Sequence, residues 1–231
     1  FYNDGAENAL IRRVLMLDVY NSVQLCDGLY IGLNHSQPSG NPATTCLNSF
    51  YNSVSMRIAY YRCAAVKNVH ALPFSEAVSM VSYGDDNVIN FSERVAHYFD
   101  QVEVTEAYSS FGMVYTDEAK TGEIVRCRKL EDVAYLKRGF RKDGPVYRAP
   151  MSLVTIMETP YWIRKCPDHD LATKMNVECS IMELAQHDRE TFDRLSQQII
   201  GCYYEKTGTY PEVMSYDTYQ EEWNREMGLL V

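Results

Sequence analysis

The stretch Glu76-Ala-Val-Ser-Met-Val-Ser-Tyr-Gly-Asp-Asp-Asn-Val-Ile-Asn-Phe91 decides how this chain folds. Residues 76–82 and 87–91 are rich in apolar and β-branched side chains, so each segment is expected to form a β-strand. Between them, Tyr83-Gly-Asp-Asp86 contains a glycine followed by two acids, which favours a tight turn. The stretch therefore predicts a hairpin whose tip carries two adjacent carboxylates.

Adjacent carboxylates such as Asp85 and Asp86 suit a magnesium site for phosphoryl transfer. Mg²⁺ prefers hard oxygen ligands, and it is usually held by one or two carboxylates while substrate phosphates fill other positions. An acidic hairpin turn by itself is more often only solvated. The magnesium interpretation therefore depends on the segments that accompany the hairpin.

Three further segments accompany the hairpin in order along the chain. They are Gln37-Pro-Ser-Gly-Asn-Pro-Ala-Thr-Thr-Cys-Leu-Asn-Ser49 upstream, and Gly112-Met-Val-Tyr-Thr-Asp-Glu-Ala-Lys-Thr-Gly122 and Tyr135-Leu-Lys-Arg-Gly-Phe-Arg141 downstream. The ordered set resembles palm motifs B, C, D and E of the RNA-dependent RNA polymerases of picorna-like positive-strand RNA viruses. The similarity is closest to replicases of the dicistrovirus and marnavirus type, and with a helical, thumb-like tail it covers nearly the whole chain.

The resemblance implies an α+β fold with a right-hand polymerase palm, in which helices pack on an antiparallel sheet, followed by a helical thumb. A change of composition near Asp143-Gly-Pro145 predicts the boundary, with the palm at residues 1–142 and the thumb at 143–231. The fingers and the first palm motif are missing and are expected upstream of Phe1. We therefore interpret the chain as a fragment of a larger polymerase that is itself cut from a polyprotein.

Local patterns predict the individual elements. Strand character is expected at residues 28–32, at 113–116 and, with a hairpin, within 123–140, and a loop is expected at 38–42. Apolar residues at helical spacing predict helices at 6–25, 43–67, 94–111, 151–158, 170–187, 189–207 and 216–227.

The resemblance assigns the chemistry to Asp85, Asp86 and Lys120. Asp85 would ligate Mg²⁺, or Mn²⁺ in its place, together with an aspartate expected just before Phe1, and Asp86 would support the metal site. Lys120 matches the family's lysine proposed as the general acid that protonates the leaving pyrophosphate. The alternative for Lys120 is a solvated loop lysine flanked by acids.

Nucleotide recognition would involve five residues. Gly40 lets the backbone approach a ligand closely, and the loop feeds a helix N-terminus, which favours a phosphate. By resemblance, Ser39 and Gly40 contact the template–product duplex and the incoming NTP, while Thr44 and Asn48 recognise the ribose 2′-hydroxyl with Asp4. The alternatives are a helix-capping turn, a surface amide and, for Asp4, a helix N-cap.

Lys137 and Arg138 would grip the primer strand, because their segment matches the family's fifth motif. Contact with phosphates requires positive charge on a firm platform. Both belong to the one concentration of basic residues in the chain, which comprises Lys129, Lys137, Arg138, Arg141, Lys142 and Arg148. A plain solvated face is the alternative.

Composition and missing motifs exclude other classes. A net charge of -9, from 31 acids and 22 bases, argues against a free-standing nucleic-acid-binding protein, whereas a palm whose acids hold metal is compatible with it. The seven cysteines never fall at Cys-x-x-Cys spacing and indicate reduced thiols. Signatures of zinc proteases, serine hydrolases, dinucleotide-binding folds and Walker loops do not occur. No apolar run is long enough for direct membrane insertion.

The sequence thus predicts RNA-templated RNA synthesis by two-metal nucleotidyl transfer from NTPs to a primer 3′-hydroxyl, with the isolated fragment inactive. The expected partners are RNA template and primer, NTPs, the missing fingers and the rest of a viral polyprotein. The expected location is the host cytoplasm, including membrane-associated replication complexes. The alternatives are a non-catalytic RNA-binding or scaffold fragment and a reverse transcriptase, which Gly84 and Asn48 disfavour.

Overall fold

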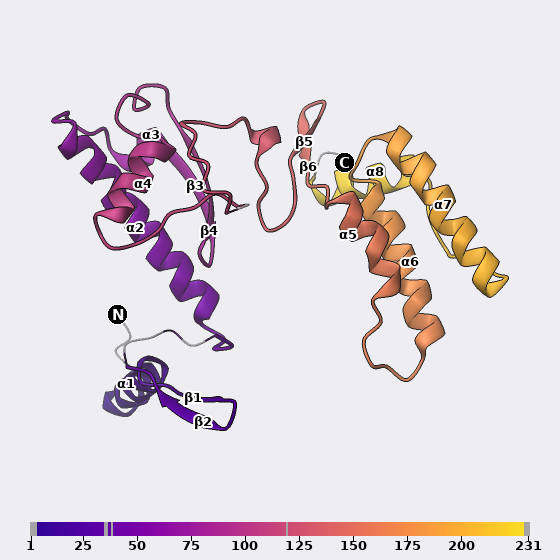
Figure 1. Ribbon diagram of the computed structural model, residues 1–231, viewed down its shortest axis with the longest axis horizontal. Helices are drawn as coiled ribbons and strands as arrows, with labels where there is room; N and C mark the ends of the chain where they lie inside the picture. The colour runs from indigo at the N-terminus through magenta and orange to yellow at the C-terminus, as the bar shows by residue number, and fades with distance from the viewer. Residues whose placement is uncertain (1–3, 35–36, 38, 119, 229–231) are drawn as a thin grey trace. The chain divides into compact units, whose positions relative to one another are not determined.

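The computed structural model describes residues 4–34, 37, 39–118 and 120–228. The chain separates into two units, Phe1–Tyr115 and Thr116–Val231, and each unit has its own hydrophobic core. Among the described residues, helices are combined with three separate antiparallel pairs of strands (Figure 1). The predicted α+β class is therefore confirmed.

The first unit begins with a helix that is shorter than predicted, and a hairpin follows it where the sequence predicted only its second strand. α1 spans Ala6–Tyr20, and β1 (Val23–Cys26) pairs antiparallel with β2 (Leu29–Gly32). The prediction of a helix up to residue 25 was wrong from Asn21 onward. The two turn residues, Asp27 and Gly28, both have positive φ, at 49° and 81°, and an Asp-Gly pair in that conformation is the strongest short hairpin signal.

Neither α1 nor the β1–β2 hairpin buries its apolar side chains. α1 contains no buried residue, and both strands are exposed along their whole length. The exposed apolar side chains are Leu10, Ile11, Val14, Leu15, Met16, Leu17, Tyr20, Val23, Leu25, Leu29, Tyr30 and Ile31. This part of the described chain is therefore held by local hydrogen bonds and not by a core of its own.

The core of the first unit lies along one face of α2 (Thr44–Val66), a helix that the sequence predicted closely. That face meets α4 (Gln101–Ser109) and the hairpin of β3 (Val78–Tyr83) and β4 (Asp86–Phe91), which follows the single turn α3 (Phe74–Ala77) (Figure 1). The predicted strand at 76–82 begins later because Glu76 and Ala77 belong to α3.

α4 is shorter than the helix predicted at 94–111. Residues 92–99 form turns, and Asp100 then caps the helix by accepting hydrogen bonds from the backbone N–H groups of Val102 and Glu103, at 2.8 and 3.1 Å. Such a cap satisfies N–H groups that have no partner within the helix. The strand predicted at 113–116 was wrong for the described residues, which provide no neighbouring strand.

A closed set of hydrogen bonds lies within this core. The Tyr60 hydroxyl donates to the carbonyl oxygen of Leu72 at 2.9 Å, so the Tyr98 hydroxyl donates to the Tyr60 oxygen at 2.7 Å. The backbone N–H of Leu72 donates to the Tyr98 oxygen at 3.4 Å. Tyr60 is fully buried, and burial raises its pKa, so the hydroxyl stays a donor.

The second unit starts with little regular structure and ends in helices. It contains the 3-10 turn η1 (Leu130–Asp132), the hairpin of β5 (Arg141–Asp143) and β6 (Val146–Arg148), α5 (Leu153–Glu158), the 3-10 turn η2 (Thr159–Tyr161), α6 (His169–Leu184), α7 (Arg189–Thr207) and α8 (Tyr216–Glu226). Within residues 123–140, the predicted strands are reduced to isolated bridges in the described chain. The helical character of the C-terminal part is confirmed.

The core of the second unit joins α5, α6, α7 and α8, with Ile181 and Leu184 fully buried at its centre. The predicted boundary at residues 142 and 143 falls inside β5, whereas the two units divide between Tyr115 and Thr116. The assignment of palm and thumb to 1–142 and 143–231 stays a prediction. No helix in the described ranges combines the length and the apolar character needed to cross a bilayer.

We expect Tyr60→Phe to lower the free energy of unfolding by about 1–2 kcal/mol, because the change leaves the Leu72 carbonyl without its donor in a buried site. The matched control is Tyr30→Phe, since Tyr30 is 82% exposed. Urea unfolding of the three proteins measures the difference. Equal destabilisation by both changes would contradict the importance of the hydrogen-bonded set.

We expect Asp188→Ala to destabilise α7 in a pH-dependent way. Asp188 caps α7 by accepting from Thr191 N–H at 2.9 Å and from its hydroxyl at 2.9 Å, and these bonds lower the Asp188 pKa. Because the folded-state pKa is the lower one, the contribution is full above about pH 4 and is lost as the pH falls through the folded-state pKa. At neutral pH the cost should be about 0.5–1 kcal/mol.

Thermal unfolding over a range of pH measures this effect, with Asp193→Ala on the exposed side of α7 as the control. A difference between wild type and Asp188→Ala that does not shrink in acid would count against the cap.

Candidate active site

The β3–β4 hairpin presents Asp85 and Asp86 at its tip. Tyr83 pairs with Asp86, so only Gly84 and Asp85 lie between paired residues. Gly84 has φ 64° at the first central position of this two-residue turn, where a residue with a side chain would be strained. Both carboxylates are exposed. The predicted hairpin with two adjacent carboxylates is confirmed.

The tip is fixed to α2 by two polar side chains. The backbone N–H of Gly84 donates to the Ser49 hydroxyl oxygen at 2.8 Å. The Asn52 side-chain nitrogen lies 2.8 Å from the carbonyl oxygen of Asp85, 3.3 Å from that of Gly84 and 3.4 Å from that of Asp86. Since Ser49 and Asn52 are three residues apart, they share one face of the helix.

A second pair of hydrogen bonds extends from Asn52 away from the tip. The Asn87 side-chain nitrogen donates to Asn52 Oδ1 at 3.1 Å, and the Tyr115 hydroxyl donates to Asn87 Oδ1 at 2.9 Å. Burial raises the pKa of Tyr115 to about 12, although its bond to Asn87 acts in the opposite direction. The hydroxyl is therefore protonated and able to donate at neutral pH.

Sequence reasoning missed Ser49 and Asn52. Their signal is position, because Asn52 and Ser55 lie on the stripe of α2 that also carries Met56, Ala59 and Tyr60, and all five are buried. A buried amide on a core-facing stripe requires a hydrogen-bonding partner. The sequence shows that such a partner is needed, but not that the partner is the Asp85 turn.

The predicted nucleotide-binding residues lie at and before the start of α2. Thr44 and Asn48 stand eight and four residues before Asn52, so the three side chains follow one stripe of the helix, with a rise of about 6 Å from each to the next. Gln37 donates from Nε2 to the Thr44 hydroxyl oxygen at 3.1 Å. Ser39 and Gly40 form a turn before the helix, with Gly40 at φ 89°. The structure thus aligns Thr44 and Asn48 with the helix face that binds the tip.

Asp4 is paired with Arg12. Its two carboxylate oxygens each accept a hydrogen bond of 2.7 Å from the Arg12 guanidinium, which lowers the Asp4 pKa. The N-cap of α1 is Gly5 without a side-chain cap. The N-cap alternative for Asp4 is therefore wrong, and its carboxylate is an ionised acceptor.

Lys120 lies in the second unit, in a turn built around Asp117. Lys120 has φ 53°, and its N–H donates to the carbonyl oxygen of Asp117 at 3.1 Å. The buried Asp117 carboxylate accepts from the N–H and the hydroxyl of Thr121, at 3.0 and 2.9 Å, and lies 3.6 Å from Arg128. The pKa of Asp117 is lowered, chiefly by the hydrogen bond from the Thr121 hydroxyl. The Lys120 side chain is exposed.

Lys137 and Arg138 lie at a tight turn but have different surroundings. Tyr135 and Arg138 exchange two backbone hydrogen bonds of 2.8 and 3.0 Å, while Leu136 and Lys137 between them have φ of 51° and 63°. The Arg138 guanidinium donates two bonds of 2.8 Å to Glu183, which raises the Arg138 pKa. Lys137 is exposed, so it is the cation of this turn that faces solvent.

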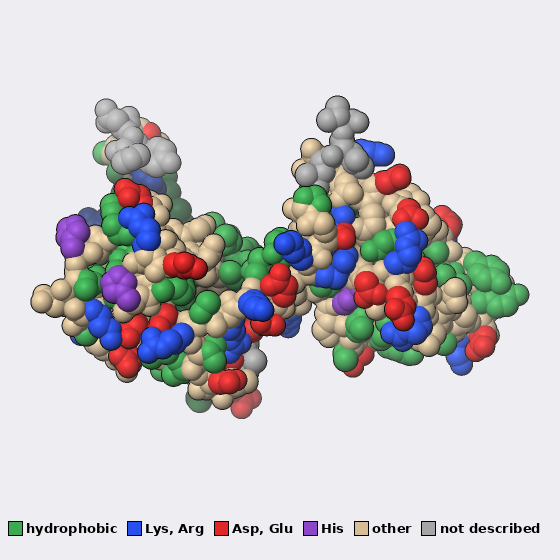
Figure 2. Space-filling model, turned by 90° about the horizontal axis from the view of Figure 1, so that it is seen from above, with side chains coloured by type: hydrophobic (Ala, Val, Ile, Leu, Met, Phe, Trp, Pro, Cys, Tyr) green, Lys and Arg blue, Asp and Glu red, His purple; other side chains and the backbone are tan. Residues whose placement is uncertain are grey.

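One face of the molecule carries charges of mixed sign. On the face seen in Figure 2, Lys and Arg side chains alternate with Asp and Glu, and no broad area of the described residues on that face carries one sign.

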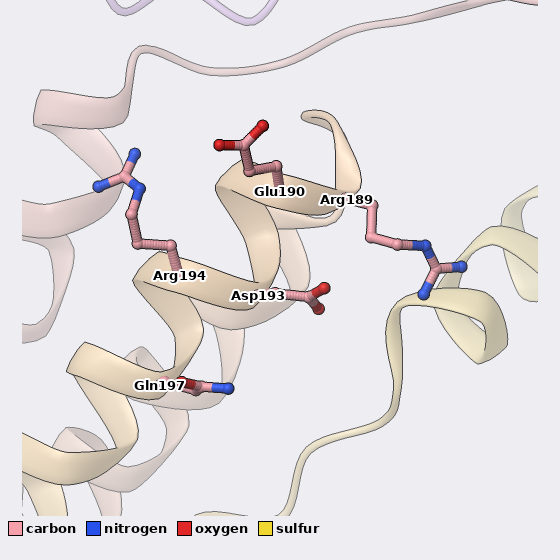
Figure 3. A pocket seen from close by; sticks show the side chains of 5 residues that line it. All are labelled: Arg189, Glu190, Asp193, Arg194 and Gln197. Carbon is pink, nitrogen blue, oxygen red and sulfur yellow. The ribbon is translucent and has the colours of Figure 1, made fainter.

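A shallow hollow lies on α7. It is lined by Arg189, Glu190, Asp193, Arg194 and Gln197 (Figure 3). Arg189 points toward α8, pairs with Asp217 and stacks over the Tyr216 ring with 4.7 Å to its centroid. Over the described ranges, no three His, Cys, Asp or Glu side chains gather as metal ligands. The hollow is therefore an ordinary charged helix surface.

Known proteins are similar to this chain in sequence and in fold. The chain is 47% identical over 236 residues to the replicase polyprotein of Acute bee paralysis virus (strain Rothamsted), covering 96% of the chain and 12% of that protein. It is 34% identical over 227 residues to the replicase polyprotein of Drosophila C virus (strain EB), covering 92% and 13%. The chain thus spans about an eighth of these relatives.

A solved structure of a viral polymerase has a similar fold. The Sicinivirus 3Dpol RNA dependent RNA polymerase superposes with a TM-score of 0.68 at 18% identity, covering 90% of this chain and 41% of that one. The predicted right-hand polymerase fold is confirmed by this match. Residues 3–203 also match the family described as viral RNA-dependent RNA polymerase. The chain therefore belongs to the viral RNA-dependent RNA polymerase family.

Proposed function

We propose that this chain is the palm and thumb of an RNA-directed RNA polymerase that transfers nucleotides from NTPs to the 3′-hydroxyl of a primer on an RNA template. The observation that carries the proposal is the Asp85–Asp86 tip, bonded to α2 within a chain of the polymerase family. Template, primer and NTPs would be its partners, together with a fingers subdomain and the rest of a viral polyprotein. Its setting would be the host cytoplasm, including membrane-associated replication complexes.

The tip has the donor set for a divalent metal. Asp85 and Asp86 are exposed carboxylates on a turn, and a Cβ added at Gly84 would meet nothing within 4 Å, so space is open beside them. Mg²⁺ is held by few carboxylates and keeps positions for phosphates and water. Asp85, with an aspartate expected upstream of Phe1, would hold Mg²⁺ or Mn²⁺, with Asp86 in support. Bound there, the metal would lower the pKa of the primer hydroxyl and neutralise phosphate charge.

The residues around the tip would select the nucleotide. Thr44 and Asn48 continue the Asn52 stripe of α2 toward the N-terminus of the helix, so they would lie beside the sugar of an NTP whose phosphates approach Asp85. A ribose 2′-hydroxyl both donates and accepts, which an amide and a hydroxyl can match. The ionised Asp4 would accept from that hydroxyl directly or through a partner. Ser39 and Gly40 would contact the duplex and the incoming nucleotide.

Two lysines of the second unit would act on phosphates. Lys120 would donate a proton to the leaving pyrophosphate, and the turn around Asp117 supports this role because it holds the Lys120 backbone while leaving its side chain exposed. Lys137 would contact the primer backbone. Arg138 would contribute mainly by anchoring that turn through Glu183.

We expect Asp85→Asn to reduce primer extension by at least about 100-fold, the loss typical of removing one electrostatic stabiliser from an active site. The assay uses the chain extended upstream through the expected fingers, with RNA template, primer, NTPs and Mg²⁺. Asp18→Asn is the matched control, because Asp18 is an exposed aspartate of α1. The chain of 231 residues alone should not extend the primer.

Extension by wild type and Asp18→Asn, but not by Asp85→Asn, would support the proposal. Equal activity of Asp85→Asn would make the hairpin purely structural. Inactivity of all three proteins would favour the non-catalytic scaffold.

We expect Lys137→Ala to affect RNA binding and Arg138→Ala to affect stability. Lys137→Ala should weaken primer–template binding and reduce the slope of log affinity against log salt by about 1, with Tm unchanged. Arg138→Ala should lower stability by about 0.5–1 kcal/mol, because Glu183 loses its partner. Fluorescence anisotropy and thermal unfolding measure the two effects. A fall in Tm for Lys137→Ala would argue against an RNA-facing role.

A further inference from the structure

The carbonyl oxygens of Gly84, Asp85 and Asp86 converge on one side-chain nitrogen. Asn52 Nδ2 lies 3.3, 2.8 and 3.4 Å from them, respectively. Carbonyl oxygens only accept hydrogen bonds, so the amide must turn its nitrogen toward the tip. Its two hydrogens then serve consecutive peptide groups, with the shortest bond made to Asp85.

The orientation of Asn52 fixes the next two groups. Its oxygen faces away from the tip and accepts from Asn87 Nδ2 at 3.1 Å, so the Asn87 oxygen accepts from the Tyr115 hydroxyl at 2.9 Å. Each amide thus has one possible orientation. We call Asn52, Asn87 and Tyr115 the Asn52 network.

The burial of Asn52 indicates that its amide serves to make these hydrogen bonds. Asn52 is 7% exposed and lies on the core-facing stripe of α2, where an unbonded amide would be strongly unfavourable and an apolar side chain would pack without that cost. The bonds that satisfy it go to the backbone of the two aspartates themselves. A residue needed only for packing would not require this geometry.

We propose that Asn52 is a positioning residue for the polymerase reaction: it fixes the peptide planes of the tip and so aims the Asp85 and Asp86 carboxylates. The proposal rests on the proposed function. Rotation of a peptide plane swings the attached side chain, and a misplacement of about 1 Å costs on the order of 100-fold in rate. Ser49 holds the same turn from the Gly84 N–H and limits how far it can move.

The test compares Asn52→Ala and Asn52→Asp with Asn90→Ala and Asn90→Asp in the upstream-extended polymerase. Asn90 is the matched control because it is an exposed asparagine of β4. Primer extension is titrated with Mg²⁺ at saturating NTP. Both Asn52 variants should lose about 10- to 100-fold in kcat and need several-fold more Mg²⁺ for half-maximal rate, whereas the Asn90 variants should match wild type.

Two further measurements separate positioning from mere stability. Tyr115→Phe removes the far donor of the Asn52 network and should raise the Mg²⁺ requirement less than Asn52→Ala does. Thermal unfolding of every variant identifies those that fail to fold. The positioning role would be overturned if the Asn52 variants had a lower Tm but their folded fraction kept the wild-type kcat and the wild-type Mg²⁺ dependence of primer extension.

Hydrogen–deuterium exchange at the Gly84 amide gives a readout that needs no activity. Exchange should become faster in Asn52→Ala and stay at the wild-type rate in Asn90→Ala. Unchanged exchange in Asn52→Ala, with an active wild type, overturns the proposal and leaves the polymerase function intact. An inactive wild type overturns the proposed function itself, and with it a catalytic purpose for Asn52, even where exchange responds as expected.

Discussion

The hydrogen bonds between α2 and the Gly84–Asp86 turn are the constraint on which the candidate active site depends. An isolated two-stranded hairpin is marginally stable in water, so β3 and β4 need a second layer. α2 supplies it twice, through the apolar stripe that includes Met56 and Tyr60 and through Ser49 and Asn52 at the tip. The apolar contacts hold the strands, and the polar ones set the direction in which the turn faces.

Charge and burial are divided in a consistent way across the residues of chemical interest. The carboxylates of Asp85 and Asp86 and the ammonium groups of Lys120 and Lys137 are exposed. The groups that hold their backbones are more buried, as with Asn52 behind the tip and Asp117 behind Lys120. This arrangement keeps these four charged groups hydrated, while low-dielectric surroundings strengthen the hydrogen bonds that hold their backbones.

The sequence predicted those parts of the fold that depend on local signals. α7 was predicted with its observed bounds because Asp188 caps its start and Gly208, with φ 70°, ends it. The Asp85 hairpin followed from two segments rich in apolar and β-branched residues on either side of a glycine and two acids. Elements that depend on distant partners were not predictable in this way: residues 113–116 have strand-like composition but no described neighbour, and the bonds of Asn52 join residues more than thirty positions apart.

The exposed hairpin of β1 and β2 has a consequence for handling the chain as a separate protein. Among the described residues, each of the two strands pairs along one edge only, and the solvent-facing side chains of the hairpin include Val23, Leu25, Leu29 and Tyr30. Unpaired edges with apolar side chains recruit strands from neighbouring molecules. Residues 23–32 contain none of the lysines or prolines that natural edge strands use against such pairing. The monomeric fraction of the chain would therefore fall as its concentration rises, through intermolecular sheet formation that begins at this hairpin while both cores remain folded.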